Sequence, residues 1–219
     1  EHDVGGQPVS VIRRVDSAAI PRPCLFQVHG GGFVMGNRAG DLAPVLDWVE
    51  HFDAVAVVPE YRLAPEHPAP AAVDDTLAAL RWLLDHTDEL GVDPERIVAV
   101  GWSAGGGILA GAMLRHRDAG GLLLAGQMLV YPMLDDRDIG VAKTQLARTI
   151  LWNSISNDTG WNAYLGAARG GPDVSPYDAP ARATDLSGLP PTYIEVGSVD
   201  LFRDEDVAFA STMWACGGD

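Results

Sequence analysis

Ser103 stands between two glycines in residues 101–105, which read Gly-Trp-Ser-Ala-Gly. A short apolar, β-branched run precedes it at residues 97–100, and the small and apolar residues from 104 onward read as a helix. We therefore expect a buried strand that turns directly into a helix. Small residues in such a turn leave the hydroxyl of the serine unobstructed by neighbouring side chains. The N-terminus of the helix directs its N–H groups toward that hydroxyl. The pattern predicts an exposed serine nucleophile, although a glycine-rich turn without any chemistry would read the same way.

Three consecutive glycines follow a second expected strand, residues 24–29, in the sequence His-Gly-Gly-Gly-Phe. Consecutive glycines cost backbone entropy, so a fold keeps them where the backbone itself must approach another group. Their N–H groups can converge on one oxygen, as an oxyanion hole requires. A phosphate-binding loop is the alternative, but the Gly-Lys-Ser/Thr sequence of such loops is missing here.

Together the two motifs resemble the hormone-sensitive-lipase-like esterases of the α/β-hydrolases, in which a His-Gly-Gly-Gly loop precedes a Gly-x-Ser-Ala-Gly-Gly elbow. The resemblance implies that Ser103 is the nucleophile. It also implies that the N–H groups of Gly31, Gly32 and Ala104 hold the developing oxyanion, and that His29 supports the loop instead of transferring protons.

A third stretch, residues 61–68 (YRLAPEHP), is similar to a scaffold segment of the same family. Its prolines impose an ordered, non-helical path beneath the glycine loop. Glu66 and His67 could be read as a catalytic pair, but the resemblance implies a structural role for both.

Asp200 follows the expected strand at residues 193–197, at the sheet edge where catalytic groups of an open α/β sheet gather. It begins the sequence DLFRDE, which resembles the family's DPLRDE with Leu201 in place of proline. The resemblance implies that Asp200 orients a catalytic histidine. The alternatives are three carboxylates at the start of an expected helix, where the helix dipole alone favours them: Asp204, Glu205 and Asp206.

The catalytic base is the main departure from the family pattern. All six histidines precede Asp200, whereas the family's histidine follows the acid: His2, His29, His51, His67, His86 and His116. The resemblance thus implies a fold truncated at both ends, without the family's N-terminal cap helices and C-terminal histidine region. A serine without its base is a weak nucleophile. Two alternatives to an esterase therefore remain: a catalytically silent hydrolase fold that binds an apolar ligand or a partner, and another reaction on the same scaffold, such as amide hydrolysis or acyl transfer.

Strands alternate with helices along the 219 residues, of which 47% are hydrophobic, so we expect one α/β domain over residues 1–219. The resemblance implies a mostly parallel central sheet with helices on both faces. Residues 135–171 interrupt the alternation, and the resemblance favours a partial cap that walls the substrate pocket, with ordinary helix packing as the alternative. The strand at residues 193–197 would be an exposed edge, which predicts pairing with a second copy in a homo-oligomer.

Composition and charge limit the classes of partner that the chain is expected to bind. A formal charge of −15 disfavours binding to nucleic acid. No run approaches the roughly 18 apolar residues of a membrane span. Cys24 and Cys216 are too few for a disulfide framework and lack the spacing of zinc ligands, so we expect a cytoplasmic protein. The resemblance implies no metal or organic cofactor, and a small apolar acyl ester as the substrate, cleaved through an acyl-enzyme.

Overall fold

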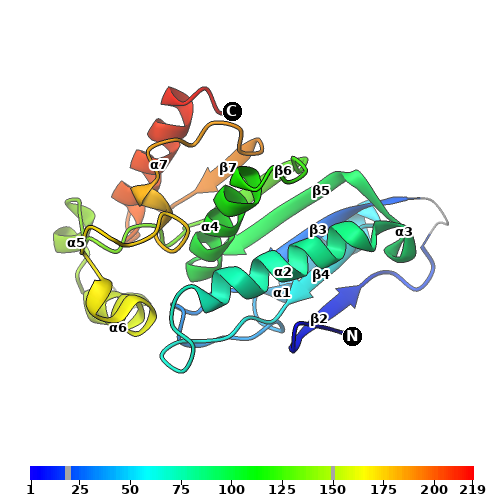
Figure 1. Ribbon diagram of the computed structural model, residues 1–219, viewed down its shortest axis with the longest axis horizontal. Helices are drawn as coiled ribbons and strands as arrows, with labels where there is room; N and C mark the ends of the chain where they lie inside the picture. Colours follow the sequence, from blue (N-terminus) through cyan, green and yellow to red (C-terminus); the bar gives the residue numbers. More distant parts are fainter. Residues whose placement is uncertain (18–20, 149–150) are drawn as a thin grey trace.

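The computed structural model describes residues 1–17, 21–148 and 151–219, and a seven-stranded sheet runs through them (Figure 1). The strand order is β1-β2-β4-β3-β5-β6-β7. The strands are β1 (His2–Val4), β2 (Gln7–Ile12), β3 (Arg22–Val28), β4 (Val55–Pro59), β5 (Val92–Trp102), β6 (Gly126–Val130) and β7 (Thr192–Glu195). β1 and β2 pair antiparallel with their neighbours, and the pairs from β4 to β7 are parallel. The expected mostly parallel sheet is confirmed.

Helices cover both faces of the sheet because its central strands are apolar on both sides. In β4, Val55 and Val57 join one buried cluster, whereas Ala56 and Val58 join the other, as the two-residue period of a strand requires. The second cluster includes α1 (Leu42–Phe52), and the first includes residues of the helices on the other face. Those helices are α2 (Ala71–Asp85), α4 (Ala104–Asp118), α6 (Ser154–Leu165) and α7 (Arg203–Ala215).

Short elements complete the chain. They are the helices α3 (Thr87–Leu90) and α5 (Ala142–Gln145), and the 3-10 turns η1 (Gly166–Ala168) and η2 (Pro180–Arg182). The strand β1 lacks the apolar run by which the others are recognised in the sequence. β7 lies at the edge of the sheet in the described residues, at the place the sequence predicts for an exposed edge.

The segment 135–171 packs over the glycine loop through α6. Trp161 and Tyr164 are fully buried, and the Tyr164 ring stacks on Phe33 with 4.3 Å between ring centroids. Phe33 directly follows the three glycines, so α6 lies against the loop. The role of this segment as a cap stays a prediction.

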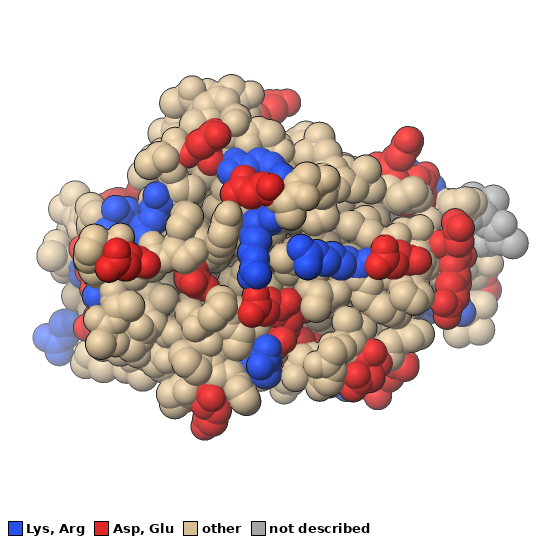
Figure 2. All heavy atoms as spheres, in the orientation of Figure 1, with Lys and Arg blue, Asp and Glu red and all other residues tan. Residues whose placement is uncertain are grey.

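Figure 2 shows acidic and basic side chains interspersed over the face of the molecule that it presents. The net negative charge is therefore not gathered in one region of that face. Every helix in the described part of the chain is too short or too polar to cross a membrane.

Candidate active site

Ser103 lies at the junction of β5 and α4 in a conformation that few residues adopt. Its backbone angles are φ 53° and ψ −122°, outside the regions allowed without strain for a residue with a side chain. Such strain costs about 1–3 kcal/mol and persists only where surrounding contacts impose it. Here the Ser103 N–H donates to the Val130 carbonyl at 2.9 Å, and its carbonyl accepts from the Met133 N–H at 3.0 Å. The peptide units on both sides of the serine are therefore fixed by the end of β6.

Two glycines let α4 begin directly against the neighbouring backbone. A Cβ on Gly105 would lie 2.2 Å from the His29 carbonyl oxygen, and a Cβ on Gly101 would lie 2.6 Å from the Gly105 carbonyl oxygen. No real side chain fits at such distances. The two glycines thus bring the end of β3, and the glycine loop that follows it, next to Ser103.

The glycine loop presents free backbone donors beside the serine. Gly31 and Gly32 have φ angles of 129° and 60°, and a Cβ on Gly31 would lie 1.9 Å from the Met35 carbonyl oxygen. The N–H groups of Gly31, Gly32 and Ala104 form no hydrogen bond with any described residue. A Cβ built on Gly30 would lie 3.5 Å from the Ser103 Cβ, so the loop and the serine are in contact distance. These donors are available to a ligand oxygen.

His29 is built into the scaffold. Its Nδ1 lies 2.7 Å from the Gly30 carbonyl oxygen, and its Nε2 lies 3.1 Å from Glu60 Oε1. The ring stacks on Tyr61 at 4.1 Å, and the Tyr61 hydroxyl donates to the His29 carbonyl at 2.9 Å. With both ring nitrogens engaged, His29 holds the loop and is not placed to take a proton from Ser103.

Asp200 shares a cavity with Ser103. This open cavity of about 770 Å³ is lined by Ser103, Tyr131, Leu151, Trp152, Gly197, Val199, Asp200, Leu201 and Phe202. The Asp200 Oδ1 accepts from the Phe202 N–H at 2.9 Å, which fixes the orientation of the carboxylate. None of the three alternative carboxylates lines this cavity: Asp204, Glu205 and Asp206.

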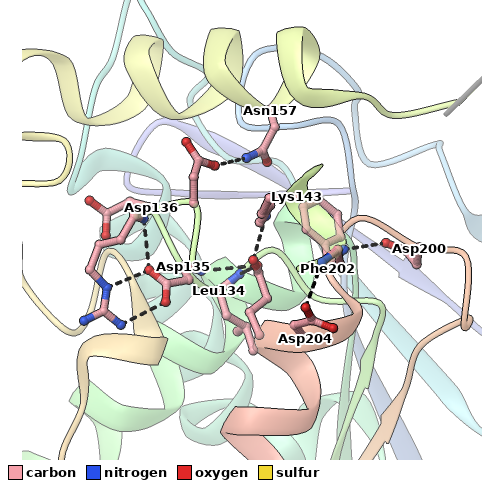
Figure 3. A network of polar contacts seen from close by, with 12 residues as sticks. Leu134, Asp135, Asp136, Lys143, Asn157, Asp200, Phe202 and Asp204 are labelled. Carbon is pink, nitrogen blue, oxygen red and sulfur yellow. Dashed lines mark hydrogen bonds and ion pairs between the residues drawn. The ribbon is translucent and has the colours of Figure 1, made fainter. Parts of the chain in front are cut away.

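The three alternatives have other surroundings, which Figure 3 shows in part. Asp204 is bound by Arg203 at 2.8 Å and by the Ala142 N–H at 2.8 Å. Glu205 is buried and pairs with Lys143 at 2.7 Å, yet burial outweighs the ion pair and raises the pKa of Glu205 to about 7. Asp206 is fully buried without a hydrogen-bond partner in the described chain, and burial raises its pKa to about 10. The sequence predicts Glu205 and Asp206 at the start of a helix, where the helix dipole favours carboxylates, but it does not predict that both are buried.

A second cavity, of about 320 Å³, also borders Ser103. Its lining includes Gly30 and Gly31 of the glycine loop, together with Asn37, Asp41 and Trp102. Tyr131 also lines it, and sequence reasoning missed this residue. Its position directly after the apolar strand β6 was the available signal, because side chains at the carboxyl ends of parallel strands gather at the same edge.

The site contains Ser103 and Asp200 but no imidazole in reach of both. None of the six histidines of the sequence lines the larger cavity, and His29 alone among them lines the smaller one. Within the described residues, no three His, Cys, Asp or Glu side chains come together in a group that could hold a metal ion.

Comparison with known proteins assigns the class. Residues 25–219 match a family model described as the alpha/beta hydrolase fold. The chain belongs to this family, in the branch of esterases related to hormone-sensitive lipase, as the motifs indicated.

Individual relatives are esterases. The chain is 37% identical to Esterase LipI of Mycobacterium tuberculosis over 197 residues. The aligned region covers 89% of this chain and 61% of LipI. The chain is 36% identical over 202 residues to Carboxylesterase NlhH of the same species, again covering 61% of the relative. Among solved structures, a bacterial heroin esterase superposes with a TM-score of 0.92 at 39% identity, over 99% of this chain and 70% of that one. The chain thus spans about three fifths of the length of these two curated relatives.

Proposed function

We propose that this site is that of a serine carboxylic-ester hydrolase that acts on small apolar acyl esters through an acyl-enzyme. The observation that carries the proposal is the meeting of three groups at one point. These groups meet at Ser103, which is strained and borders both cavities: the oriented carboxylate of Asp200 lines the larger cavity, and Gly31, one of the free backbone donors, lines the smaller one.

In the proposed reaction, the Ser103 oxygen attacks the ester carbonyl carbon and gives its proton to an imidazole base. The carbonyl electron pair moves to the oxygen, where the N–H groups of Gly31, Gly32 and Ala104 stabilise the negative charge. Collapse of this intermediate expels the alcohol, which takes the proton from the imidazolium. Water then repeats the sequence on the acyl-serine and releases the acid, with Asp200 orienting the imidazole throughout.

The lining of the larger cavity supports an apolar acyl group. Besides the two polar groups of the reaction, it presents mostly apolar side chains, among them Leu151, Trp152, Val199, Leu201 and Phe202. Its volume of about 770 Å³ lies in the range usual for small-molecule sites.

One observation favours the second candidate, a silent fold that binds an apolar ligand. None of the six histidines is positioned between Asp200 and Ser103. The larger cavity nevertheless leaves space beside Asp200, and imidazole from solution can serve there as the base in an experiment.

The test is hydrolysis of p-nitrophenyl butyrate by the chain, with and without added imidazole. We expect turnover above the rate of the same imidazole solution without protein, rising with imidazole concentration, and we expect Ser103→Ala to fall to that protein-free rate. Ser211→Ala is the matched control, because the Ser211 hydroxyl is exposed on α7 and bonds the Val207 carbonyl at 2.9 Å. Equal rates for the wild-type chain and Ser103→Ala at every imidazole concentration would refute the esterase proposal and favour the silent fold.

A further inference from the structure

Lys143 is a buried cation between the segment 135–171 and the first turn of α7. It lies on α5, and only 8% of its surface is exposed. Its Nζ lies 2.7 Å from the Glu205 carboxylate and 5.0 Å from the centre of the Phe202 ring, and both partners are buried (Figure 3). A buried ion pair is seldom more stabilising than apolar side chains of similar volume. Stability alone therefore does not account for this pair.

One end of the ion pair is tied to the backbone beside the nucleophile. The Glu205 Oε1 accepts the Leu134 N–H at 2.8 Å. The preceding N–H, that of Met133, donates to the Ser103 carbonyl at 3.0 Å. Glu205 therefore holds the short segment after β6 that itself holds the backbone of Ser103.

The other end of the ion pair reaches the proposed catalytic acid through Phe202. The ammonium of Lys143 lies within the distance of a cation–π attraction to the Phe202 ring, and such an attraction is strongest where water is excluded. The Phe202 N–H donates to the Asp200 Oδ1 at 2.9 Å. A ring that is held in place keeps this N–H in place, and with it the orientation of the carboxylate.

The helix α5 is attached to α7 by contacts that do not involve Lys143. The Ala142 N–H donates to the Asp204 carboxylate at 2.8 Å, and the Arg203 guanidinium donates to the Gln145 side-chain oxygen at 3.2 Å. Substitutions of Lys143 therefore test its ammonium while the helix remains attached.

We propose that Lys143 is a positioning residue for Asp200. Its ammonium, held by Glu205, fixes the Phe202 ring and with it the N–H that orients the carboxylate. The inference rests on the proposed function, because it concerns the acid of that reaction. Lys143 is not among the described residues that line the larger cavity, so it acts through Phe202 and does not touch the ester.

The test records the amide-proton chemical shift of Phe202 by NMR at pH 8, where Glu205, with a pKa of about 7, is mostly ionised. Asp200→Ala gives the shift of this N–H without its acceptor. We expect Lys143→Met and Lys143→Gln to move the shift toward that reference, because both remove the cation. Lys143→Gln can still donate to Glu205, so it remains informative if Lys143→Met is too unstable. Lys143→Arg keeps the charge and should keep the wild-type shift.

The same variants are assayed for imidazole-dependent hydrolysis of p-nitrophenyl butyrate. We expect kcat to fall about 3- to 10-fold in Lys143→Met and Lys143→Gln, while KM changes less than about twofold, since a displaced acid affects the transition state more than the binding of the ester. Gln145→Leu is the matched control on the same helix. It removes the contact with Arg203 and should leave the Phe202 amide and the rate unchanged.

The inference is overturned if the Phe202 amide keeps its wild-type shift in both neutral variants, or if Gln145→Leu moves it as far. A raised KM with an unchanged kcat would also contradict it, because the effect would then lie in ester binding. These outcomes are separate from that of the esterase proposal. The amide shift is measured without turnover, whereas failure of the esterase proposal appears as equal rates for the wild-type chain and Ser103→Ala.

Discussion

Asp206 makes the stability of the fold depend on pH, and the single substitution Asp206→Asn removes this contribution. The side chain is fully buried in α7, and neither of its oxygens has a hydrogen-bond partner in the described residues. Burial is the largest cause of its raised pKa, followed by the charges of Glu205 and Asp200, and only Lys143 acts in the opposite direction. The pKa rises from 3.8 to about 10.

The sign of the effect follows from proton uptake. Between these two pKa values the folded chain holds a proton on Asp206 that the unfolded chain has released, so stability falls as pH rises. The slope for one such group is about 1.4 kcal/mol per pH unit. Asp206→Asn keeps the shape and removes the titration. Its free energy of unfolding, relative to the wild-type chain, should therefore increase by about 2.7 kcal/mol between about pH 5 and pH 7.

The assay is urea unfolding followed by tryptophan fluorescence at several pH values and constant ionic strength. Any fixed penalty of the amide cancels, because only the change in the difference with pH is used. Glu205 titrates in the same window, with a pKa of about 7, but it is present in both proteins. Asp204→Asn is the matched control, since Arg203 is the main cause that lowers the pKa of Asp204 and both states are ionised throughout the window.

A difference between Asp206→Asn and the wild-type chain that stays constant from pH 5 to pH 7 would refute this reasoning. It would mean that Asp206 is ionised in the folded chain and has a partner or solvent access. An equal pH trend for Asp204→Asn would likewise remove Asp206 as the cause.

Two further predictions concern packing and charge. Lys143→Met should reduce the free energy of unfolding by about 3–5 kcal/mol, because it leaves Glu205 buried without its cation at 2.7 Å. The exposed ion pair of Arg96 is the comparison, and Arg96→Ala should cost at most about 1 kcal/mol in the same urea assay. Gly111→Ala should cost about 3 kcal/mol or more, since its Cβ would lie 1.8 Å from the Tyr177 carbonyl oxygen. A stable Gly111→Ala chain with unchanged unfolding would contradict the close approach of α4 to that segment.

The parts of the site that the sequence could predict are those imposed by local backbone geometry. Gly105 must lack a side chain because a Cβ there would lie 2.2 Å from the His29 carbonyl oxygen. The Gly-x-Ser-x-Gly motif predicts a glycine at this position. The requirement for glycine at position 31, where φ is 129°, could be predicted from the sequence in the same way. The main strands of the parallel sheet were also predictable, because each is a short apolar run between turn signals.

The remainder depends on which segments meet in three dimensions. Tyr131 borders both cavities because the end of β6 lies beside Ser103. Its place directly after a strand indicates the edge of the sheet on which it lies, but not which residues it meets there. The burial of Glu205 depends on Lys143, which lies 62 positions earlier in the chain. Helix-dipole reasoning placed Glu205 and Asp206 correctly on a helix but could not say which face of α7 is buried.

The central claim is that Ser103 becomes acylated by the ester. The most direct measurement is intact mass and peptide mapping of the chain after incubation with p-nitrophenyl butyrate and imidazole, followed by an acid quench. The account predicts a butyryl group on the peptide that contains Ser103, and none at that position in Ser103→Ala. Release of p-nitrophenol without any adduct on Ser103, and at the same rate in Ser103→Ala, would contradict it.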